Sequence, residues 1–232
     1  MAATDALGEY RRKRDFGRTT EPRGEPGAAT DGEPVFVVQI HDATAMHFDF
    51  RLEVGGVLKS WAVPRGPSRD PRDKRLAVPT EDHPLEYREF EGVVDDGEYG
   101  AGVVIVWDEG TYRSLATDRH GREVPFADAL ADGHASFWLD GRKLRGGYAL
   151  TRTRGDAGRR EAWLLVKRAD ERASDRGTPD PLRARSVRTG RTLRQVAAED
   201  GGAADRVGRH GWRRGRPGGG DGGGRGSGGG RG

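Results

Sequence analysis

The segment MHFDFRLEV at residues 46–54 alternates between polar and apolar side chains. Its even-numbered positions from 48 to 54 are apolar, and its odd-numbered positions from 47 to 53 are His, Asp, Arg and Glu. Side chains on an extended strand point alternately to opposite faces of the sheet. The segment therefore predicts a strand that packs one face into a core and presents a row of polar groups on the other.

Short runs of similar character lie on both sides of this segment. They are rich in Val, Phe, Trp and Leu and are separated by Gly, Pro and Asp: FVVQI, VLKSWAV, RLAV, GVVIVWDEGTYR, SFWLDG, GYALTRTR and EAWLLVKR. This pattern is typical of strands joined by turns. Helical patterns are few, the best being PFADALADG, so alternating βαβ units are disfavoured. The pattern predicts a mainly β protein with few short helices, built as an antiparallel barrel or sandwich.

The two ends of the chain differ in composition from this central region. Residues 1–34 join a charged stretch to a Gly- and Pro-rich one, which indicates a flexible N-terminal arm that is partly ordered. Residues 35–170 hold the strand patterns and form the predicted barrel domain. Residues 171–200 are rich in Arg, Asp and Ser and are typical of a linker. Half of residues 201–232 are Gly, interspersed with Arg, which predicts a disordered tail.

Composition excludes several kinds of chemistry. The 232 residues include no cysteine, so disulfides, thiolate nucleophiles and Cys-ligated zinc are ruled out. No apolar run is long enough for a signal core or a membrane span, which predicts a cytoplasmic protein without a membrane. The net charge is +3, but residues 201–232 hold seven Arg and two Asp, or +5, which leaves −2 for residues 1–200. Basic residues in the body must therefore act as local groups.

A metal site is the chemical interpretation of the polar strand face. His47 and Asp49 are two residues apart on that face, about 7 Å, and can converge on one cation. His41 can supply a third ligand from the preceding strand or turn. Two imidazoles and one carboxylate suit Mn²⁺, Fe²⁺ or Zn²⁺ and leave positions open for water and substrate. Arg51 would lie beside the ion and bind a phosphate with it. The alternative is an ordinary solvated strand face with cross-strand ion pairs.

Further candidates follow along the chain. Lys59, Arg65 and Arg75 lie near predicted strand ends and suggest an anion pocket, although 33% of the chain is charged and solvated cations are the alternative. His83 and Tyr87 add a titratable group and a hydroxyl in the segment EDHPLEY. A single His before Pro is otherwise a common loop residue.

Longer blocks resemble a known family: HDATAMHFDFRLEVGGVLKSWAVPRGPS, DKRLAVPTEDHPLEY, FEGVVDDGEYGAGVVIVWDEGTY and EAWLLVKR. From about Tyr10 to Arg168 the chain is similar to the 3′-phosphoesterase domain of bacterial DNA ligase D. The resemblance implies a small β-barrel that uses Mn²⁺, with Co²⁺ or Zn²⁺ as other metals. It implies removal of a 3′-terminal ribonucleoside and then the 3′-phosphate from DNA or RNA/DNA ends in non-homologous end joining. It also implies a nucleoid-associated monomer that works with a separate ligase, polymerase or Ku-type end-binding protein.

The resemblance implies a role for each matching residue. The metal ligands would be His41, His47 and Asp49. The scissile phosphate would be contacted by Arg51, Arg75 and His83, with Tyr87 beside them, and an acidic N-terminal arm would supply Asp15 and Glu21. His83 would protonate the leaving oxygen or stabilise the transition state. Arg65 stands where the family commonly has Lys in the motif P-K-G-P, so a planar guanidinium replaces a point charge. Residues 186–197 resemble the linker to the ligase domain, and we expect a stand-alone phosphoesterase.

Two other functions match part of the pattern. His47-x-Asp49 with a later His is also the facial triad of non-haem iron oxygenases, although the surrounding cations favour phosphate chemistry. The Arg- and Gly-rich tail is typical of a non-catalytic nucleic-acid-binding protein that binds by counterion release. We expect deletion of residues 201–232 to weaken DNA binding at low salt and to leave cleavage intact.

Overall fold

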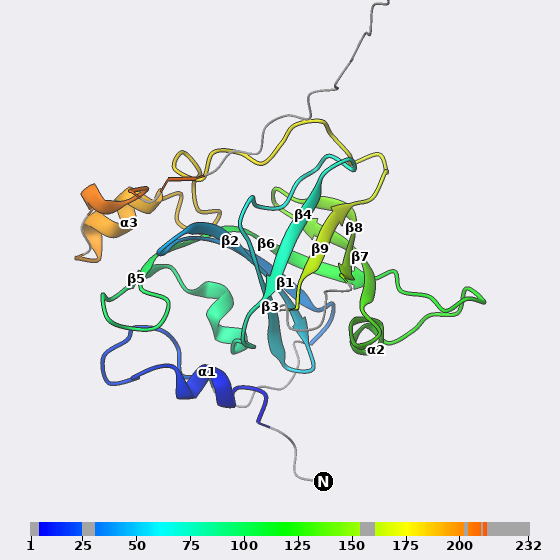
Figure 1. Cartoon of the computed structure of the whole chain (residues 1–232), viewed down its shortest axis with the longest axis horizontal. Helices are drawn as coiled ribbons and strands as arrows, with labels where there is room; N and C mark the ends of the chain where they lie inside the picture. Colours follow the sequence, from blue (N-terminus) through cyan, green and yellow to red (C-terminus); the bar gives the residue numbers. More distant parts are fainter. Residues whose placement is uncertain (1–4, 25–30, 154–160, 202–203, 210, 213–232) are drawn as a thin grey trace, which may run out of the picture.

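The computed structural model describes residues 5–24, 31–153, 161–201, 204–209 and 211–212. Eight antiparallel strands close into a barrel in the order β1-β2-β3-β4-β9-β8-β7-β6, and β1 pairs with β6 to complete the ring (Figure 1). A ninth strand, β5, pairs with β6 at the rim. The predicted mainly β fold and its antiparallel barrel are confirmed.

Most strands are short, and β6 is the longest. The strands are β1 (Val35–Asp42), β2 (Met46–Val54), β3 (Val57–Val63), β4 (Lys74–Pro79), β5 (Gly92–Val94), β6 (Gly102–Ser114), β7 (His134–Gly141), β8 (Arg145–Arg152) and β9 (Trp163–Lys167). The helices are α1 (Gly8–Arg12), α2 (Phe126–Ala131) and α3 (Leu193–Glu199), with 3₁₀ turns η1 (Leu85–Glu89) and η2 (Ala204–Arg206). In the described part of the chain, no helix has the length and apolar character needed to cross a membrane.

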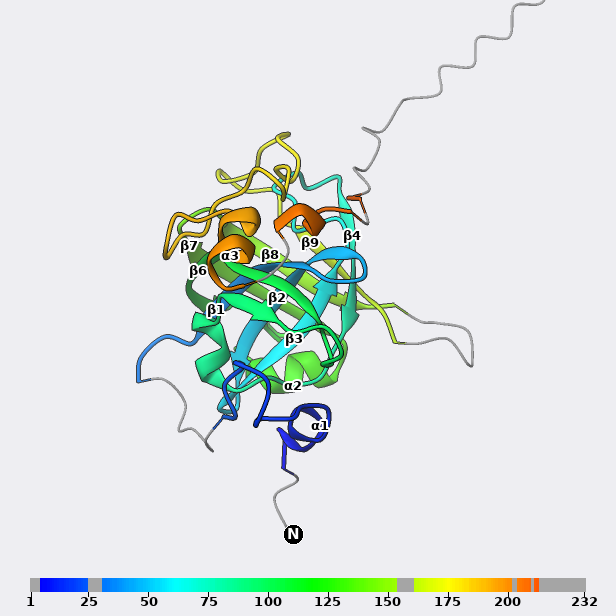
Figure 2. The same ribbon diagram turned by 90° about the vertical axis from the view of Figure 1, so that its left-hand side faces the viewer.

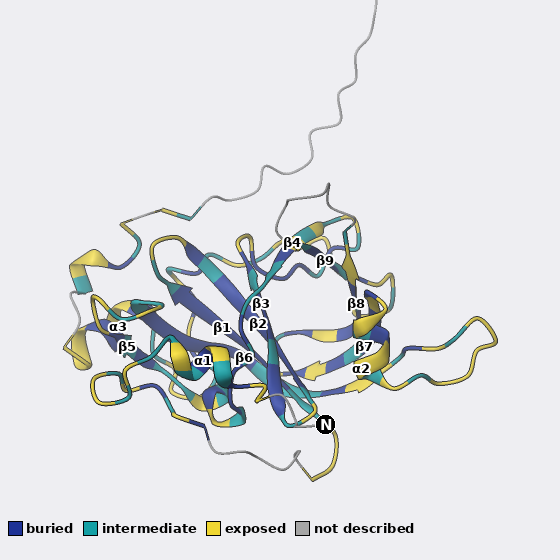
Figure 3. Cartoon of the chain, turned by 60° about the horizontal axis from the view of Figure 1, so that its bottom comes forward, coloured by how far each residue is buried: buried dark blue, intermediate teal, exposed yellow. Residues whose placement is uncertain are grey.

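The even-numbered residues of β2 point into the barrel. Phe48, Phe50 and Leu52 are fully buried there. The ring of Phe50 lies 6.5 Å from that of Phe36 on β1 and 5.9 Å from that of Phe137 on β7, measured between centroids. Burying one such side chain contributes about 1.5–3 kcal/mol. The buried residues follow the strands around the barrel (Figure 3), so this face of β2 anchors the main core.

A second, smaller apolar cluster lies on the outer face of the barrel. It consists of Tyr10, Val37, Leu58, Tyr87 and Val106. Tyr10 comes from α1 and Tyr87 from η1, so the N-terminal arm and η1 cover the outside of the sheet at this place. Strands β1 and β2 are therefore buried on both faces over most of their length. Polar groups on that outer face need partners in the protein, because water is largely excluded.

The chain after β9 also packs against the barrel. A capping box begins α3: Thr192 Oγ1 accepts the Gln195 N–H at 3.3 Å, and Gln195 Oε1 accepts the Thr192 N–H at 3.0 Å. Four apolar residues join the main core cluster: Leu193, Val196, Ala197 and Val207. Figure 2 shows α3 close to β6. Residues 171–200, expected to be linker-like, thus include a helix held by the barrel. Of the expected tail, residues 202–203, 210 and 213–232 lie outside the described residues.

Candidate metal centre

The three predicted ligands meet on the outer face of β1 and β2. His41 and His47 are direct cross-strand partners, and Asp49 follows on the same face of β2. Their candidate ligand atoms all lie within 4.8 Å of one another. His41 Nδ1 is 3.6 Å from Asp49 Oδ2, and His47 Nε2 is 3.4 Å from Asp49 Oδ1. This spacing fits one cation bound by two imidazoles and one carboxylate.

Backbone carbonyls orient both imidazoles. His41 Nε2 donates to Gly100 O at 2.8 Å, and His47 Nδ1 donates to Ala45 O at 2.8 Å. A carbonyl oxygen only accepts, so these two nitrogens carry protons, and the opposite ring nitrogens, which face Asp49, are the ones available to a metal ion. The orientation of the two rings therefore matches the one that a metal ion bound by His41, His47 and Asp49 would require.

The charges around Asp49 keep it ionised. Burial alone would raise the pKa of Asp49, but the positive charges of Arg51 and His47 hold that pKa well below its ordinary value. Arg51 Nη2 donates to Asp49 Oδ2 at 2.9 Å. Burial alone would lower the pKa of His47, and the Asp49 carboxylate outweighs it and raises that pKa. A proton and a metal cation therefore compete for the same place between His47 and Asp49.

Arg51 is the centre of a buried hydrogen-bond network beside the ligands. Its side chain is 3% exposed. Nε donates to Gln39 Oε1 at 2.8 Å, and Nη1 donates to Ser60 Oγ at 2.9 Å and lies 2.9 Å from His83 Nδ1. Because every side of the guanidinium has a partner, its plane is fixed between Asp49 and His83.

His83 is buried between two guanidinium groups. Its Nδ1 faces Arg51, and its Nε2 lies 3.5 Å from Arg14 Nη2. Burial, and then the charges of Arg51 and Arg14, lower the pKa of His83 well below its ordinary value. The imidazole is therefore neutral at pH 7.

The N-terminal arm reaches this network through Glu21. Glu21 Oε1 accepts from Tyr87 OH at 2.9 Å and from Arg14 Nε at 3.0 Å. Arg14 Nη1 also donates to Glu81 Oε1 at 3.1 Å. Burial, followed by the charge of Glu21, raises the pKa of Tyr87 well above its ordinary value, so its hydroxyl stays protonated. Asp15, the other predicted acidic residue of the arm, is exposed and accepts a backbone N–H of its own turn.

Lys59 lies apart from this network. In the register of β2 and β3 it is opposite Leu52, which is in the core, whereas Ser60 is opposite Arg51. Its side chain therefore points to the other face of the sheet. There it forms an ion pair with Asp82. The structure does not bring Lys59 together with the metal ligands.

Arg65 and Arg75 form a second pair of cations near the start of β2. The register of β2 and β3 places the loop after β3, which carries Arg65, beside His47. Burial lowers the pKa of Arg75, the charge of Asp73 opposes this, and the charge of Arg65 lowers that pKa further. Arg75 Nη2 donates to Asp73 Oδ2 at 2.7 Å, and its buried Nε has no hydrogen-bond partner in the described residues. Within that part of the chain no hydrogen bond joins this pair to the metal ligands.

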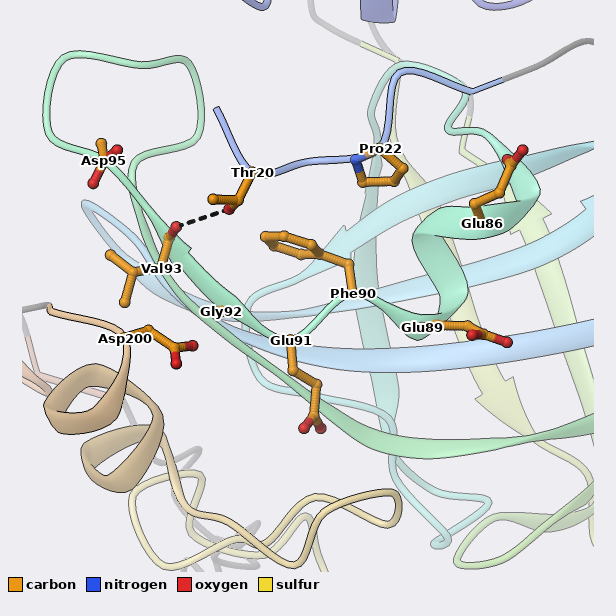
Figure 4. Close-up of a pocket in the computed structure, with 10 residues that line it drawn as sticks. All are labelled: Thr20, Pro22, Glu86, Glu89, Phe90, Glu91, Gly92, Val93, Asp95 and Asp200. Atoms are coloured by element: carbon orange, nitrogen blue, oxygen red, sulfur yellow. Dashed lines mark hydrogen bonds between the residues drawn. The ribbon is translucent and has the colours of Figure 1, made fainter. Parts of the chain in front are cut away.

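An acidic pocket of about 500 Å³ lies between the arm and α3 (Figure 4). Its carboxylates are Glu86, Glu89, Glu91, Asp95 and Asp200. Thr20 Oγ1 donates to Val93 O at 3.4 Å at one side of it. Carboxylates repel a phosphate group, so this pocket does not extend the anion site.

Several residues of the network were not identified from the sequence. Gln39 alternates with His41 on β1 and so shares the face of the metal ligands, which is a signal that the strand pattern carries. Ser60, Glu81 and Arg14 reach the site from other elements, and their role follows from contacts that are distant in the chain.

Comparison with known proteins finds similarity to one family in the region that carries this site. Residues 39–152 match the family model described as the DNA ligase D 3′-phosphoesterase domain. The multifunctional non-homologous end joining protein LigD of Pseudomonas aeruginosa is 48% identical over 196 residues, which covers 83% of this chain and 22% of that protein. The multifunctional non-homologous end joining DNA repair protein LigD of Mycobacterium tuberculosis is 46% identical over 152 residues, covering 66% of this chain and 19% of that protein. The chain thus spans about a fifth of the length of these curated relatives.

Proposed function

We propose that the chain is a metal-dependent phosphoesterase acting on the 3′ ends of nucleic-acid strands, because residues 39–152 match the model of the DNA ligase D 3′-phosphoesterase domain. The observation that carries the proposal is the convergence of His41, His47 and Asp49. Both imidazoles donate to backbone carbonyls and turn their other ring nitrogen towards an ionised carboxylate. A polar strand face held only by ion pairs would not need this arrangement.

Mn²⁺ is the proposed ion, with Co²⁺ or Zn²⁺ as alternatives, because imidazole and carboxylate ligands suit all three. When bound, such an ion supplies a Lewis acid for a phosphate oxygen and lowers the pKa of a bound water. Three protein ligands leave positions open for substrate and water. Because the pKa of His47 is raised, metal affinity should fall in acid solution.

The buried network beside the ligands takes the remaining roles. Arg51 orients Asp49 and offsets the negative charge that develops on the phosphoryl oxygens. Of the two roles considered for His83, stabilisation of the transition state is favoured, because a neutral imidazole between two guanidinium groups is a poor proton donor. Tyr87, which stays protonated, donates its single O–H to Glu21, and this bond fixes the hydroxyl beside the network.

Arg65 and Arg75 are proposed to bind phosphates that neighbour the reacting phosphate in the nucleic-acid strand. Arg75 is opposite Leu165, a core residue, and so lies on the other face of the sheet from Asp49. A guanidinium at position 65 can bind a phosphate through two parallel hydrogen bonds, which an ammonium group does not offer. Lys59 is left out of the proposed contacts.

The proposed substrates are DNA or RNA/DNA 3′ ends that carry a terminal ribonucleoside or a 3′-phosphate. Relatives from Pseudomonas aeruginosa and Mycobacterium tuberculosis are named as multifunctional end-joining proteins, which supports a place in end-joining repair. Such a monomer would act in the cytoplasm at the nucleoid. A ligase, a polymerase or a Ku-type end-binding protein would act on the same ends.

A labelled primer–template that ends in one ribonucleotide tests the proposal. With Mn²⁺ we expect a primer shortened by one nucleoside with a 3′-phosphate, followed by loss of that phosphate, resolved at single-nucleotide length. Asp49→Ala and His47→Ala should abolish both steps, and Leu76→Ala, at an exposed position of β4, should leave them unchanged. Full activity in Asp49→Ala would refute the metal site. Turnover of 2-oxoglutarate without strand cleavage would favour an iron oxygenase instead.

A further inference from the structure

Tyr99 is an exposed aromatic residue at the edge of the metal centre. It is 48% exposed, and Leu76 is the other large hydrophobic residue of comparable exposure in the described part of the chain. The next residue, Gly100, accepts the proton of His41 Nε2 at 2.8 Å. Since consecutive Cα atoms are about 3.8 Å apart, Tyr99 stands one residue from the backbone group that orients a proposed metal ligand.

The N-terminal arm holds the ring of Tyr99 in a defined position. Lys13 Nζ lies 4.4 Å from the ring centroid and donates to the hydroxyl at 3.2 Å. The guanidinium carbon of Arg14 lies 5.8 Å from the same centroid. The preceding residue, Glu98, forms an ion pair with Arg18 at 3.3 Å. The loop between β5 and β6 is thereby joined to the arm, and both lie on the same side of the barrel (Figure 1).

Two cations that also pair with carboxylates lie around this ring: Lys13 pairs with Glu9 and Glu81, and Arg18 pairs with Glu98. The side chain of Lys13 is 25% exposed and that of Arg18 is 65% exposed. A flat aromatic face next to accessible positive charge has the two features that single-stranded nucleic acid needs, a surface for the base and a counter-charge for the phosphate. A protein partner would need neither the flat face nor its position beside the metal ligands.

We propose that Tyr99 stacks on the base of the nucleotide that carries the scissile phosphate, and so holds that phosphate at the metal centre. The inference rests on the proposed function and adds a specificity-determining residue to it. Every base has a π face, so the contact recognises a base without selecting its identity. The loss of one such stack corresponds to a decrease of about 5- to 150-fold in kcat/KM.

Oligonucleotides that carry a 3′-phosphate, with or without a base on the terminal nucleotide, test this contact. With the base present, Tyr99→Ala should decrease kcat/KM by about 5- to 150-fold, mainly through KM. With an abasic terminal nucleotide, Tyr99→Ala and the wild type should be equal. Tyr99→Phe and Tyr99→Trp should keep most of the activity on both substrates, and Leu76→Ala is the control for loss of an exposed apolar side chain.

An equal loss on both substrates would overturn the proposal, because it would mean that the ring only supports the loop that orients His41. Isothermal titration with Mn²⁺ measures that alternative directly: stacking predicts the same metal affinity in Tyr99→Ala as in the wild type. Activity of Tyr99→Ala equal to wild type on the substrate with a base would also overturn it.

A binding measurement separates this inference from the proposed function. An oligonucleotide with 2-aminopurine at its phosphorylated 3′ end should lose fluorescence on binding to the wild type without Mn²⁺, because stacking quenches the base. Tyr99→Ala should abolish the quenching and Tyr99→Phe should keep it. A wild type that quenches the probe but processes no 3′ end would contradict the proposed function and leave the contact standing. A wild type that cleaves but quenches no more than Tyr99→Ala would contradict the contact alone.

Discussion

The N-terminal arm, residues 5–24, and the C-terminal segment, residues 171–201 and 204–209, both pack on the barrel from outside, and they differ in the groups that they bury. The arm is attached by charged groups: Arg14 pairs with Glu21 and Glu81, and all three side chains are at most 4% exposed. The C-terminal segment is attached by apolar side chains that join the main core. Both segments also bury apolar side chains, Tyr10 of the arm among them, but the buried ion pairs that reach the metal centre come from the arm.

This difference predicts which of the two segments affects catalysis and which affects stability. A buried ion pair gains energy only in accurate geometry and with every charge paired, so the arm and the electrostatics of the metal centre form one system. Apolar packing is non-directional and has little effect on charges at a distance. We therefore expect changes in the arm to alter catalysis and changes in the C-terminal segment to alter stability.

The largest expected effect is on the free energy of unfolding, from a change in the C-terminal segment. Leu193→Ala should lower the free energy of unfolding by about 2–5 kcal/mol, because Leu193 is 1% exposed and its loss leaves a cavity. Urea denaturation measures this. The kcat/KM of the folded fraction should stay within twofold of wild type. Arg194→Ala, at the adjacent exposed position, is the matched control and should change the free energy of unfolding by less than about 0.5 kcal/mol. A large loss of kcat/KM in folded Leu193→Ala would contradict the expectation that the C-terminal segment affects stability and not catalysis.

The next largest effect is expected on kcat/KM, from a change in the buried network of the N-terminal arm. Glu21→Gln should decrease kcat/KM by about 10- to 100-fold, because the buried Arg14 loses a charged partner and Tyr87 loses its orienting carboxylate. Steady-state kinetics on a 3′-phosphate oligonucleotide measures this. Asp15→Asn is the matched arm control, since Asp15 is exposed and an Asn oxygen can still accept the backbone N–H of the turn. Equal losses in both variants would mean that the acidity of the arm matters more than the network.

The buried polar network around His83 should contribute to the pH dependence of stability. The pKa of His83 is lowered in the folded protein, so the unfolded chain binds a proton more readily below about pH 6.5. The contribution of His83 is therefore present above that pH and lost as the pH falls, with a slope of up to about 1.4 kcal/mol per pH unit. Urea denaturation between pH 7.5 and about pH 5 should show a smaller slope for His83→Gln. Leu193→Ala should keep the wild-type slope, and a smaller slope in that variant would count against the separation.

The smallest effect is expected at the exposed edge of the arm. Arg18 pairs with Glu98, and the Arg18 side chain is 65% exposed. Arg18→Ala should change the free energy of unfolding by about 0.5 kcal/mol or less, because solvent screens exposed ion pairs. Thermal unfolding at low and at high salt measures this. A decrease in the free energy of unfolding well above about 0.5 kcal/mol would show that the exposed edge of the arm contributes to holding it on the barrel.

Much of the fold could be predicted from the sequence, because alternation is a local property. The positions of Phe48 and Phe50 inside the barrel, and of His47 and Asp49 together outside it, follow from the pleat of one strand. Barrel closure by β1 and β6 joins segments far apart in the chain, and no local pattern specifies it.

The candidate site was predicted where its residues share a strand and was less complete elsewhere. Lys59 is one residue from Ser60, and only the register with β2 reveals that Ser60 faces Arg51 while Lys59 faces away. The buried position of His83 depends on the arm that covers it, which supplies Arg14. Its lowered pKa therefore could not be anticipated from the value for a free imidazole.

Strand β2 supports the core with one face and the chemistry with the other. A slip of β2 by one residue against β1 would turn Phe48 and Phe50 outwards and place His47 and Asp49 in an apolar interior. A misaligned molecule would thus be inactive and unstable at once, and cellular proteases degrade unstable molecules first. Quality control that senses only unfolding would therefore also remove catalytically defective copies, so the surviving population would be enriched in complete sites.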